Sequence, residues 1–188
     1  MTTDGSSTGN TDLTGDSPSA DLAIVGVGNS IMGDDGVGPK LIERLGESAV
    51  GSAADVRLVD AGTTGFLALE AMSGAERAVV VDAVETGDPP GTIHEYRCVD
   101  GTFETEIPEM TMHDVSFTEA MAAGRDVYDL PDEIRILGVE PADVSIGEEL
   151  SEAVEQAATE LEGLLTERIG GTATNPTATE HTGSEGHS

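Results

Sequence analysis

The sequence predicts an α/β protein: a doubly wound, mostly parallel five-stranded sheet with one antiparallel edge strand and helices on both faces. Two observations predict this class. Short, uniformly apolar runs alternate with stretches whose apolar residues recur at helical spacing. Several of the apolar runs end in glycine or aspartate, which is typical of strands that deliver a site to the carboxyl edge of a parallel sheet.

The first half of the chain is expected to supply three strands and two helices. We expect strands over 22–27, 56–59 and 78–81 and helices over 38–45 and 65–72. The second and third strands lead directly into Asp60 and Asp82, and their apolar runs suit a sheet that is buried on both faces. Pro39 falls in the first turn of a helix, where proline is tolerated.

The second half is expected to add an edge strand, a central strand and two helices. We expect strands over 92–97 and 134–139 and helices over 114–123 and from 145 onward. The strand over 92–97 alternates in polarity after a Gly/Pro-rich turn, as an edge strand does. Residues 145–148 have the pattern of a capping box that opens the last helix. The buried stripe of that helix is expected to comprise Leu150, Val154, Ala157, Leu161 and Leu164.

Length and composition predict one folded domain between two polar tails. The chain has 188 residues, and both of its ends are rich in Thr, Ser, Gly and acidic residues. Such segments cannot bury enough apolar surface to offset chain entropy. We therefore expect disordered tails at 1–20 and 169–188 and a single α/β domain over 21–168.

Charge and cysteine content restrict the partners and the compartment. The chain has 37 acidic and 8 basic residues, a net charge of −29, and should therefore repel nucleic acid and anionic membranes. A charge of this size indicates a cytosol of high salt, where screening relieves self-repulsion. Cys98 is the single cysteine, which excludes a disulfide framework. With no signal-peptide pattern and no apolar run of membrane-spanning length, we expect a cytoplasmic monomer.

Two adjacent carboxylates mark the candidate site. The first strand ends at Gly26 and Gly28, and Asp34 and Asp35 follow just before a helix. An aspartate at this place commonly caps the helix, but only one of the two is needed for that. In a flavodoxin-like strand order the first and third strands are neighbours, so Asp34 and Asp35 should lie near Asp82.

A histidine could complete a ligand set at this edge of the sheet. His113 directly precedes the helix expected over 114–123, where a lone histidine is most often structural. Together with two carboxylates, however, it makes a nitrogen and oxygen set suited to a divalent metal with open coordination positions. His94 lies in the edge strand, and His181 and His187 lie in the C-terminal tail, so these three are weaker candidates.

Three other sites of α/β proteins fit the residues poorly. A dinucleotide-binding loop needs a third glycine where this chain has Ile31. A P-loop needs Gly-Lys-Ser or Gly-Lys-Thr, and the chain has neither triplet. A phosphoacceptor receiver domain needs a lysine after the last strand, but Lys40 is the only lysine and lies elsewhere.

Five blocks, in order and at fitting spacing, carry a family resemblance. They are residues 26–29 with 34–38, 60–65, 80–83 with 90–92, 113–114, and 138–141. Through these blocks the chain resembles the maturation endopeptidases of nickel–iron hydrogenases over nearly all of 21–165. The resemblance implies a phosphorylase/hydrolase-like α/β fold. It also implies a protease that removes a short C-terminal extension from the precursor of the hydrogenase large subunit after nickel insertion.

The resemblance also implies which residues act. Asp35, Asp82 and His113 would contact nickel that the substrate supplies, and zinc or cadmium could take its place. Asp35 and Asp82 would be the catalytic carboxylates. A supporting loop would comprise Gly26, Gly28, Asn29, Asp34, Gly36, Gly62 and Thr63.

Two questions stay open at this point. The substrate's nickel could polarise the scissile carbonyl, or Asp35 or Asp82 could activate water as a general base. The chain has neither a recognisable Ser or Cys nucleophile motif nor a His-Glu-x-x-His zinc helix. The alternative function is a non-catalytic, flavodoxin-like metal-binding or metallocluster-chaperone module. Loss of a C-terminal peptide from the substrate distinguishes the two functions.

Overall fold

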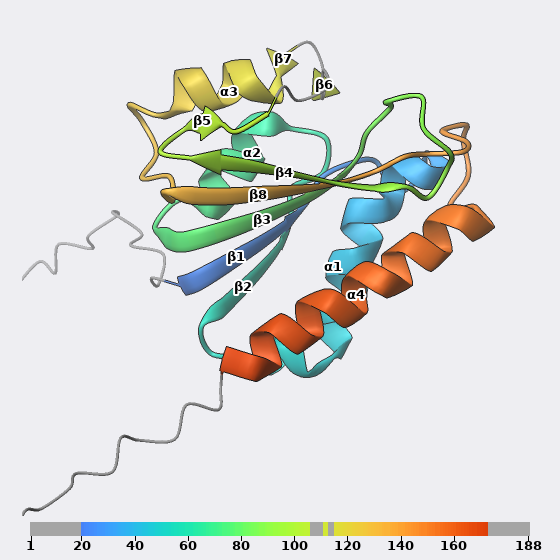
Figure 1. Cartoon of the computed structure of the whole chain (residues 1–188), viewed down its shortest axis with the longest axis horizontal. Coiled ribbons are helices and arrows are strands. Elements are labelled where there is room, and N and C mark those ends of the chain that lie inside the picture. The colour runs from blue at the N-terminus through green and yellow to red at the C-terminus, as the bar shows by residue number, and fades with distance from the viewer. Residues whose placement is uncertain (1–19, 106–110, 113–114, 173–188) are drawn as a thin grey trace, which may run out of the picture.

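The computed structural model describes residues 20–105, 111–112 and 115–172 (Figure 1). The expectation of disordered tails falls largely on 1–19 and 173–188, which lie outside the described residues. In chain order the elements are β1 (Ala20–Gly26), η1 (Gly33–Gly36), α1 (Val37–Glu47), η2 (Ala49–Ser52), β2 (Val56–Asp60), α2 (Gly65–Met72), β3 (Ala75–Ala83), β4 (Ile93–Val99), β5 (Thr102–Phe103), β6 (Thr111–Met112), β7 (Val115–Ser116), α3 (Phe117–Gly124), β8 (Glu133–Val139) and α4 (Glu152–Thr172). Among the described residues, no helix is both long and apolar enough to cross a bilayer.

The main sheet confirms the predicted doubly wound class. Its strand order is β2-β1-β3-β8-β4-β5, in which β2, β1, β3 and β8 run parallel. The expected antiparallel strand is β4, which pairs with β8. A sixth strand that the sequence did not indicate, β5, pairs with β4 across a tight turn at Asp100 and Gly101. Two residues after a turn carry no periodicity by which a strand could be predicted.

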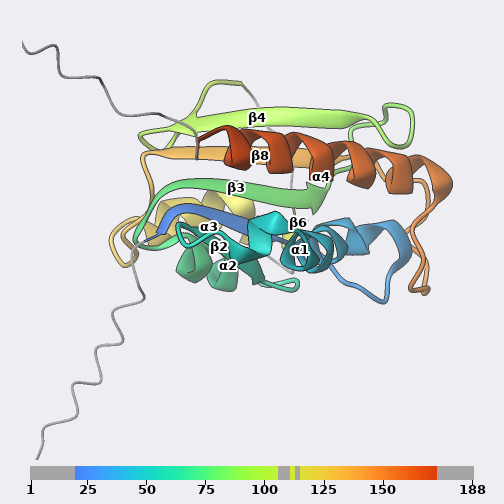
Figure 2. The same cartoon turned by 90° about the horizontal axis from the view of Figure 1, so that it is seen from below.

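Helices α1 and α4 cover one face of the sheet, and α2 and α3 cover the other (Figures 1 and 2). Alternate residues of a strand point to opposite faces, so each central strand contributes to two cores. Val25 and Val80 pack in one core with Leu69 of α2 and Phe117 of α3. In the other core, Leu41 of α1 and Leu161 of α4 pack with Ile24 and Val81 on the opposite face of the strands. Burial on both faces explains the uniformly apolar strands.

The start of the last helix differs from its prediction. The capping-box residues 145–148 are not helical, and α4 begins at Glu152. Gly147 instead forms an isolated bridge with Met32 and exchanges backbone hydrogen bonds with Ile31 and Gly33 of the loop after β1. These long-range bonds occupy backbone groups that a helix would need. Ser151 caps the helix, because its Oγ accepts a bond from the Val154 N–H at 3.4 Å.

The buried stripe of α4 is also shifted at its end. Leu164, predicted to be buried, is 40% exposed, whereas Leu165 is buried. Val154, Ala157 and Leu161 are buried as predicted, and Leu150 packs half-buried against the same core. The stripe continues from Leu161 by four residues rather than three, which keeps it on one face of a helix with 3.6 residues per turn.

Candidate active site

The site lies at the carboxyl edge of the sheet, where β1 and β3 are neighbours. Gly26 at the end of β1 is in register with Val81 of β3, and the Val27 N–H donates to the Val81 carbonyl at 2.8 Å. The loops that follow the two strands therefore leave the sheet side by side. After β1 the chain returns to the sheet as β2, on one side of this pair, and after β3 it returns as β4, on the other side. This change of direction makes the gap between β1 and β3 the topological switch point.

Glycines let the loop after β1 pack against the start of α1. A side chain at Gly26 would collide with the backbone of Gly38, and one at Gly28 would collide with the Asp35 carbonyl. Gly28 also has a φ of 130°, which side-chain-bearing residues rarely adopt. A side chain at Gly36 would press on the backbone of Ser30. These glycines let the backbone of the loop approach the start of α1 closely, with Asp35 between them.

Asp34 anchors a distant loop and caps nothing in its own helix. It is almost fully buried, and its carboxylate accepts backbone N–H bonds from Ala142 at 2.8 Å, Asp143 at 3.0 Å and Ser151 at 2.6 Å. Burial alone would raise its pKa, but these bonds hold the pKa of the Asp34 carboxyl below its ordinary value. No side chain caps η1 or α1, so the expectation that one of the pair caps the following helix is wrong. The Asp34 carboxylate instead binds backbone N–H groups of residues 142–151.

Asp35 is the member of the pair that interacts electrostatically with Asp82. It is half-buried, and its Oδ2 accepts a hydrogen bond from the Asn29 N–H at 2.8 Å. Asn29 in turn orders the loop, since its Oδ1 accepts from the Ile31 N–H at 3.3 Å. Within the described part of the chain the Oδ1 of Asp35 makes no hydrogen bond. One oxygen thus fixes the carboxylate, and the other is available to a ligand.

Asp82 meets Asp35 from the end of β3. It is 7% exposed, and its Oδ1 accepts a hydrogen bond from the Ala83 N–H at 2.9 Å. Burial and, after it, the negative charge of Asp35 raise the pKa of Asp82 to about 7. The two carboxylates are therefore near enough to interact electrostatically, as the flavodoxin-like order predicts. Such a pair can hold one proton near neutral pH or, when fully ionised, a dication.

The third predicted ligand cannot be placed. His113 follows β6 directly and lies outside the described residues. Within the residues that the structure does describe, no group of three or more His, Cys, Asp or Glu side chains is arranged to hold a metal ion. Of the three predicted ligands, the described residues include the two carboxylates. A metal site that includes His113 remains a prediction.

The remaining residues of the predicted supporting loop lie after β1 and after β2. The Gly28 N–H donates to the Gly62 carbonyl at 2.9 Å, which ties the loop after β1 to the loop after β2. Gly62 has a φ of 55°, and its N–H donates to Asp60 Oδ1 at 2.8 Å. Thr63 follows, half-buried. These residues tie the two loops together and contribute no charge near Asp35 and Asp82.

Glu140 is a buried acid whose role the sequence did not indicate. It follows β8 and accepts three hydrogen bonds, from the Thr86 N–H and Oγ1 at 2.7 Å each and from the Gly87 N–H at 3.0 Å. Burial would raise its pKa, but these bonds hold the pKa of Glu140 below its ordinary value. Nε2 of His94 lies 3.6 Å from Asp88 and 4.0 Å from Glu140. Glu140 thus fixes the loop after Asp82, and the signal for it was an acid directly after a buried strand.

Comparison with known proteins places this geometry in a family. The model of the hydrogenase maturation protease family matches residues 39–168, a range that includes Asp82 and begins just after Asp35. The hydrogenase expression/formation protein HupD of Rhodobacter capsulatus is 30% identical over 123 residues, which are 65% of this chain and 58% of HupD. The chain spans less than two thirds of the length of the first curated relatives that it matches.

Solved structures agree with this relation. A hydrogenase 2 maturation peptidase from Thaumarchaeota archaeon SCGC_AB-539-E09 is 28% identical, with a TM-score of 0.58 over 79% of this chain and 97% of the peptidase. The hydrogenase maturating endopeptidase HybD of Escherichia coli shares the fold, with a TM-score of 0.64 at 21% identity over 80% of this chain and 93% of its own. The family model covers well over half of the chain and agrees with the sequence blocks, so this chain belongs to the hydrogenase maturation protease family.

Proposed function

We propose that this protein is an endopeptidase that removes a short C-terminal extension from the nickel-loaded precursor of a nickel–iron hydrogenase large subunit. It would act as a monomer in the cytoplasm. The observation that carries the proposal is the interacting pair of carboxylates, Asp35 and Asp82, at the switch point between β1 and β3. Family membership supports the reaction class.

The substrate's nickel is the proposed recognition element. Asp35 and Asp82 supply oxygen ligands, and His113 would supply a nitrogen ligand. Three ligands leave coordination positions open for groups of the substrate. Because the metal would be shared between enzyme and substrate, only a precursor that already carries nickel would seat its scissile bond in the crevice. Zinc or cadmium would mimic nickel in binding experiments.

Asp82 is the stronger candidate for the general base. A carboxylate whose pKa lies near neutral pH can take a proton from the attacking water and return it to the leaving amine. Asp35 is held by the Asn29 N–H. It would orient the metal, or its charge would keep the pKa of Asp82 near neutral pH. Polarisation of the carbonyl by nickel is the second route, and it uses the same residues as ligands.

The test is cleavage of a purified large-subunit precursor prepared with and without nickel. The mass of the released peptide and of the shortened subunit reports the reaction. We expect complete processing of the nickel-loaded precursor and none of the nickel-free one. Stable binding of the loaded precursor without release of a peptide would refute the protease and indicate the non-catalytic metal-binding or metallocluster-chaperone function.

A further inference from the structure

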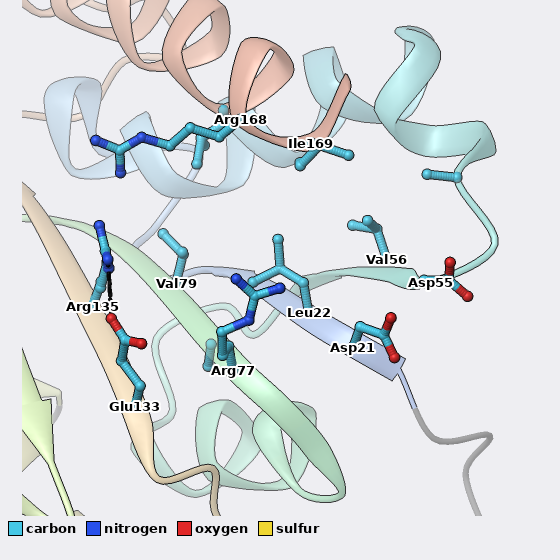
Figure 3. Close-up of a pocket in the computed structure, with 13 residues that line it drawn as sticks. Asp21, Leu22, Asp55, Val56, Arg77, Val79, Glu133, Arg135, Arg168 and Ile169 are labelled. Carbon is cyan, nitrogen blue, oxygen red and sulfur yellow. Dashed lines mark hydrogen bonds and ion pairs between the residues drawn. The ribbon is translucent and has the colours of Figure 1, made fainter. Parts of the chain in front are cut away.

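A cavity of about 460 Å³ lies at the opposite edge of the sheet from Asp35 and Asp82. It is formed where β1, β2, β3 and β8 begin and where the last turns of α4 pass over them (Figure 3). Its apolar wall includes Leu22, Val56 and Val79 from the strands and Leu165 and Ile169 from α4. A volume of this size suits a small organic ligand, for which pockets measure about 300–1,000 Å³.

Three guanidinium groups gather in this cavity. Arg77 and Arg135 come from neighbouring strands, and Arg168 projects from α4 above them (Figure 3). Arg77 and Arg135 share the strand face of Val79 and Leu137, which is the face that α1 and α4 cover. Three of the chain's 8 basic residues line this cavity beside three acids, whereas the whole chain has 37 acidic residues.

Two of the three arginines are free to bind a ligand. Arg135 is already engaged, since its Nε donates to Glu133 at 3.0 Å and its Nη1 lies 3.3 Å from Glu95. Within the described part of the chain, Arg77 and Arg168 make no hydrogen bond and no ion pair. Three acids also line the cavity, namely Asp21, Asp55 and Glu133. Asp21 precedes Leu22, the register partner of Arg77, and Glu133 is bound by Arg135.

We propose that this cavity binds a small organic oxyanion, a carboxylate or phosphate carried on an apolar body. The charged head would bridge Arg77 and Arg168, because the planar guanidinium fork matches the oxygens of a carboxylate or phosphate. The apolar body would lie against Leu22, Val79 and Ile169. Such a ligand joins the end of α4 to the sheet, so its binding stabilises the folded state by mass action. The site is separate from the proposed peptidase crevice.

The test uses the full-length protein at constant ionic strength and three probes. Octanoate carries both the anionic head and an apolar body, inorganic phosphate carries the head alone, and 1-octanol carries the body alone. We expect octanoate to raise Tm in a concentration-dependent way, phosphate to raise it less and 1-octanol not to raise it. Isothermal titration with octanoate gives Kd directly.

Two variants and a matched control decide the outcome. Arg77→Gln and Arg168→Gln remove exposed guanidiniums of the cavity and should each weaken octanoate binding by at least about tenfold. Arg44→Gln removes the same charge outside the cavity, where Arg44 pairs with Glu155 at 2.6 Å, and should leave Kd unchanged. An equal effect of 1-octanol, an unchanged Kd in both cavity variants, or no binding of octanoate by the wild type would overturn the proposal.

Discussion

The negative charge of Asp35 helps to raise the pKa of Asp82 to about 7 across the gap between the loops that follow β1 and β3. These residues are 47 positions apart in the sequence, and the parallel pairing of β1 with β3 brings them together. Burial and this coupling together bring the pKa of one of the two carboxylates close to neutral pH.

Replacing Asp82 by Asn should abolish processing and leave the fold intact. Asn has nearly the same shape and can still accept the bond from the Ala83 N–H, but it cannot bind a dication strongly or accept a proton. Loss of a metal ligand or general base costs orders of magnitude in rate. The assay is the mass of the peptide released from nickel-loaded precursor. Asp126→Asn, at an exposed position, is the matched control. Normal processing by a folded Asp82→Asn would show that Asp82 is only structural.

The raised pKa of Asp82 predicts a pH-dependent stability. An unfolded chain releases this proton near pH 4, at about the ordinary pKa of aspartate, whereas the folded protein keeps it up to about pH 7. The folded state therefore binds more protons between these values, and stability falls as pH rises through this window. The loss should be on the order of a few kcal/mol.

Denaturant unfolding of the wild type and Asp82→Asn across pH 4 to 8 isolates this contribution. Asp34 and Glu140, whose pKa values are lowered, change stability in the opposite direction, but they are present in both proteins and cancel in the comparison. We expect the variant to gain stability relative to the wild type as pH rises. Parallel pH profiles would mean that the pKa of Asp82 is the same in the folded and unfolded states.

Asp34 and Asp35 should respond differently to the same substitution. In the wild type, the backbone N–H groups of Ala142, Asp143 and Ser151 donate to the Asp34 carboxylate. In Asp34→Asn an amide NH₂, itself a donor, would face some of these N–H groups. We expect a loss of at least about 2 kcal/mol in the free energy of unfolding. Asp35→Asn loses at most one hydrogen bond and should change stability by less than about 1 kcal/mol while abolishing processing. Equal destabilisation by the two variants would contradict the division of roles.

This division shows where sequence reasoning reached its limit. The apolar runs and their aspartate ends predicted the parallel strands, the neighbouring positions of β1 and β3, and the meeting of Asp35 with Asp82. They could not separate Asp34 from Asp35, because the partners of Asp34 lie more than 100 residues away. The same contact region explains the wrong start of α4, since Gly147 pairs with the loop after β1 instead of entering a helix.

Glu140 was missed for a related reason. Its partners, Thr86 and Gly87, belong to a loop without secondary structure, so no periodicity connects them to the strand before Glu140. The fold was thus predictable from local patterns. The hydrogen bonds that hold the loops around the crevice depend on tertiary contacts between segments with no local signal.

The isolated protein should bind one divalent ion weakly and reversibly through Asp35, Asp82 and His113. Three ligands from the chain leave the coordination sphere incomplete, so the affinity should be modest without substrate. Isothermal titration with nickel, zinc or cadmium measures it in a full-length His181→Ala/His187→Ala background, which removes the histidines of the tail. We expect His113→Ala to weaken Kd at least about tenfold. His94→Ala, which changes a histidine paired with Asp88 and Glu140, is the control. An unchanged Kd in His113→Ala would exclude this ligand set.

Stability should rise steeply with salt. At a net charge of −29 the compact state repels itself, and the Debye length falls from about 10 Å at 0.1 M to about 3 Å at 1 M salt. Melting curves from 0.1 M to 3 M potassium chloride should therefore show Tm increasing most at the low end of the range.

A Glu43→Gln/Glu160→Gln/Glu167→Gln variant removes three exposed negative charges from the surface of α1 and α4. Its Tm should be higher than that of the wild type at 0.1 M and converge with it at 3 M, because screening then replaces what the substitutions removed. A flat salt curve, or a constant Tm difference between the two proteins, would show that self-repulsion does not limit this fold and would remove the argument for a high-salt cytosol.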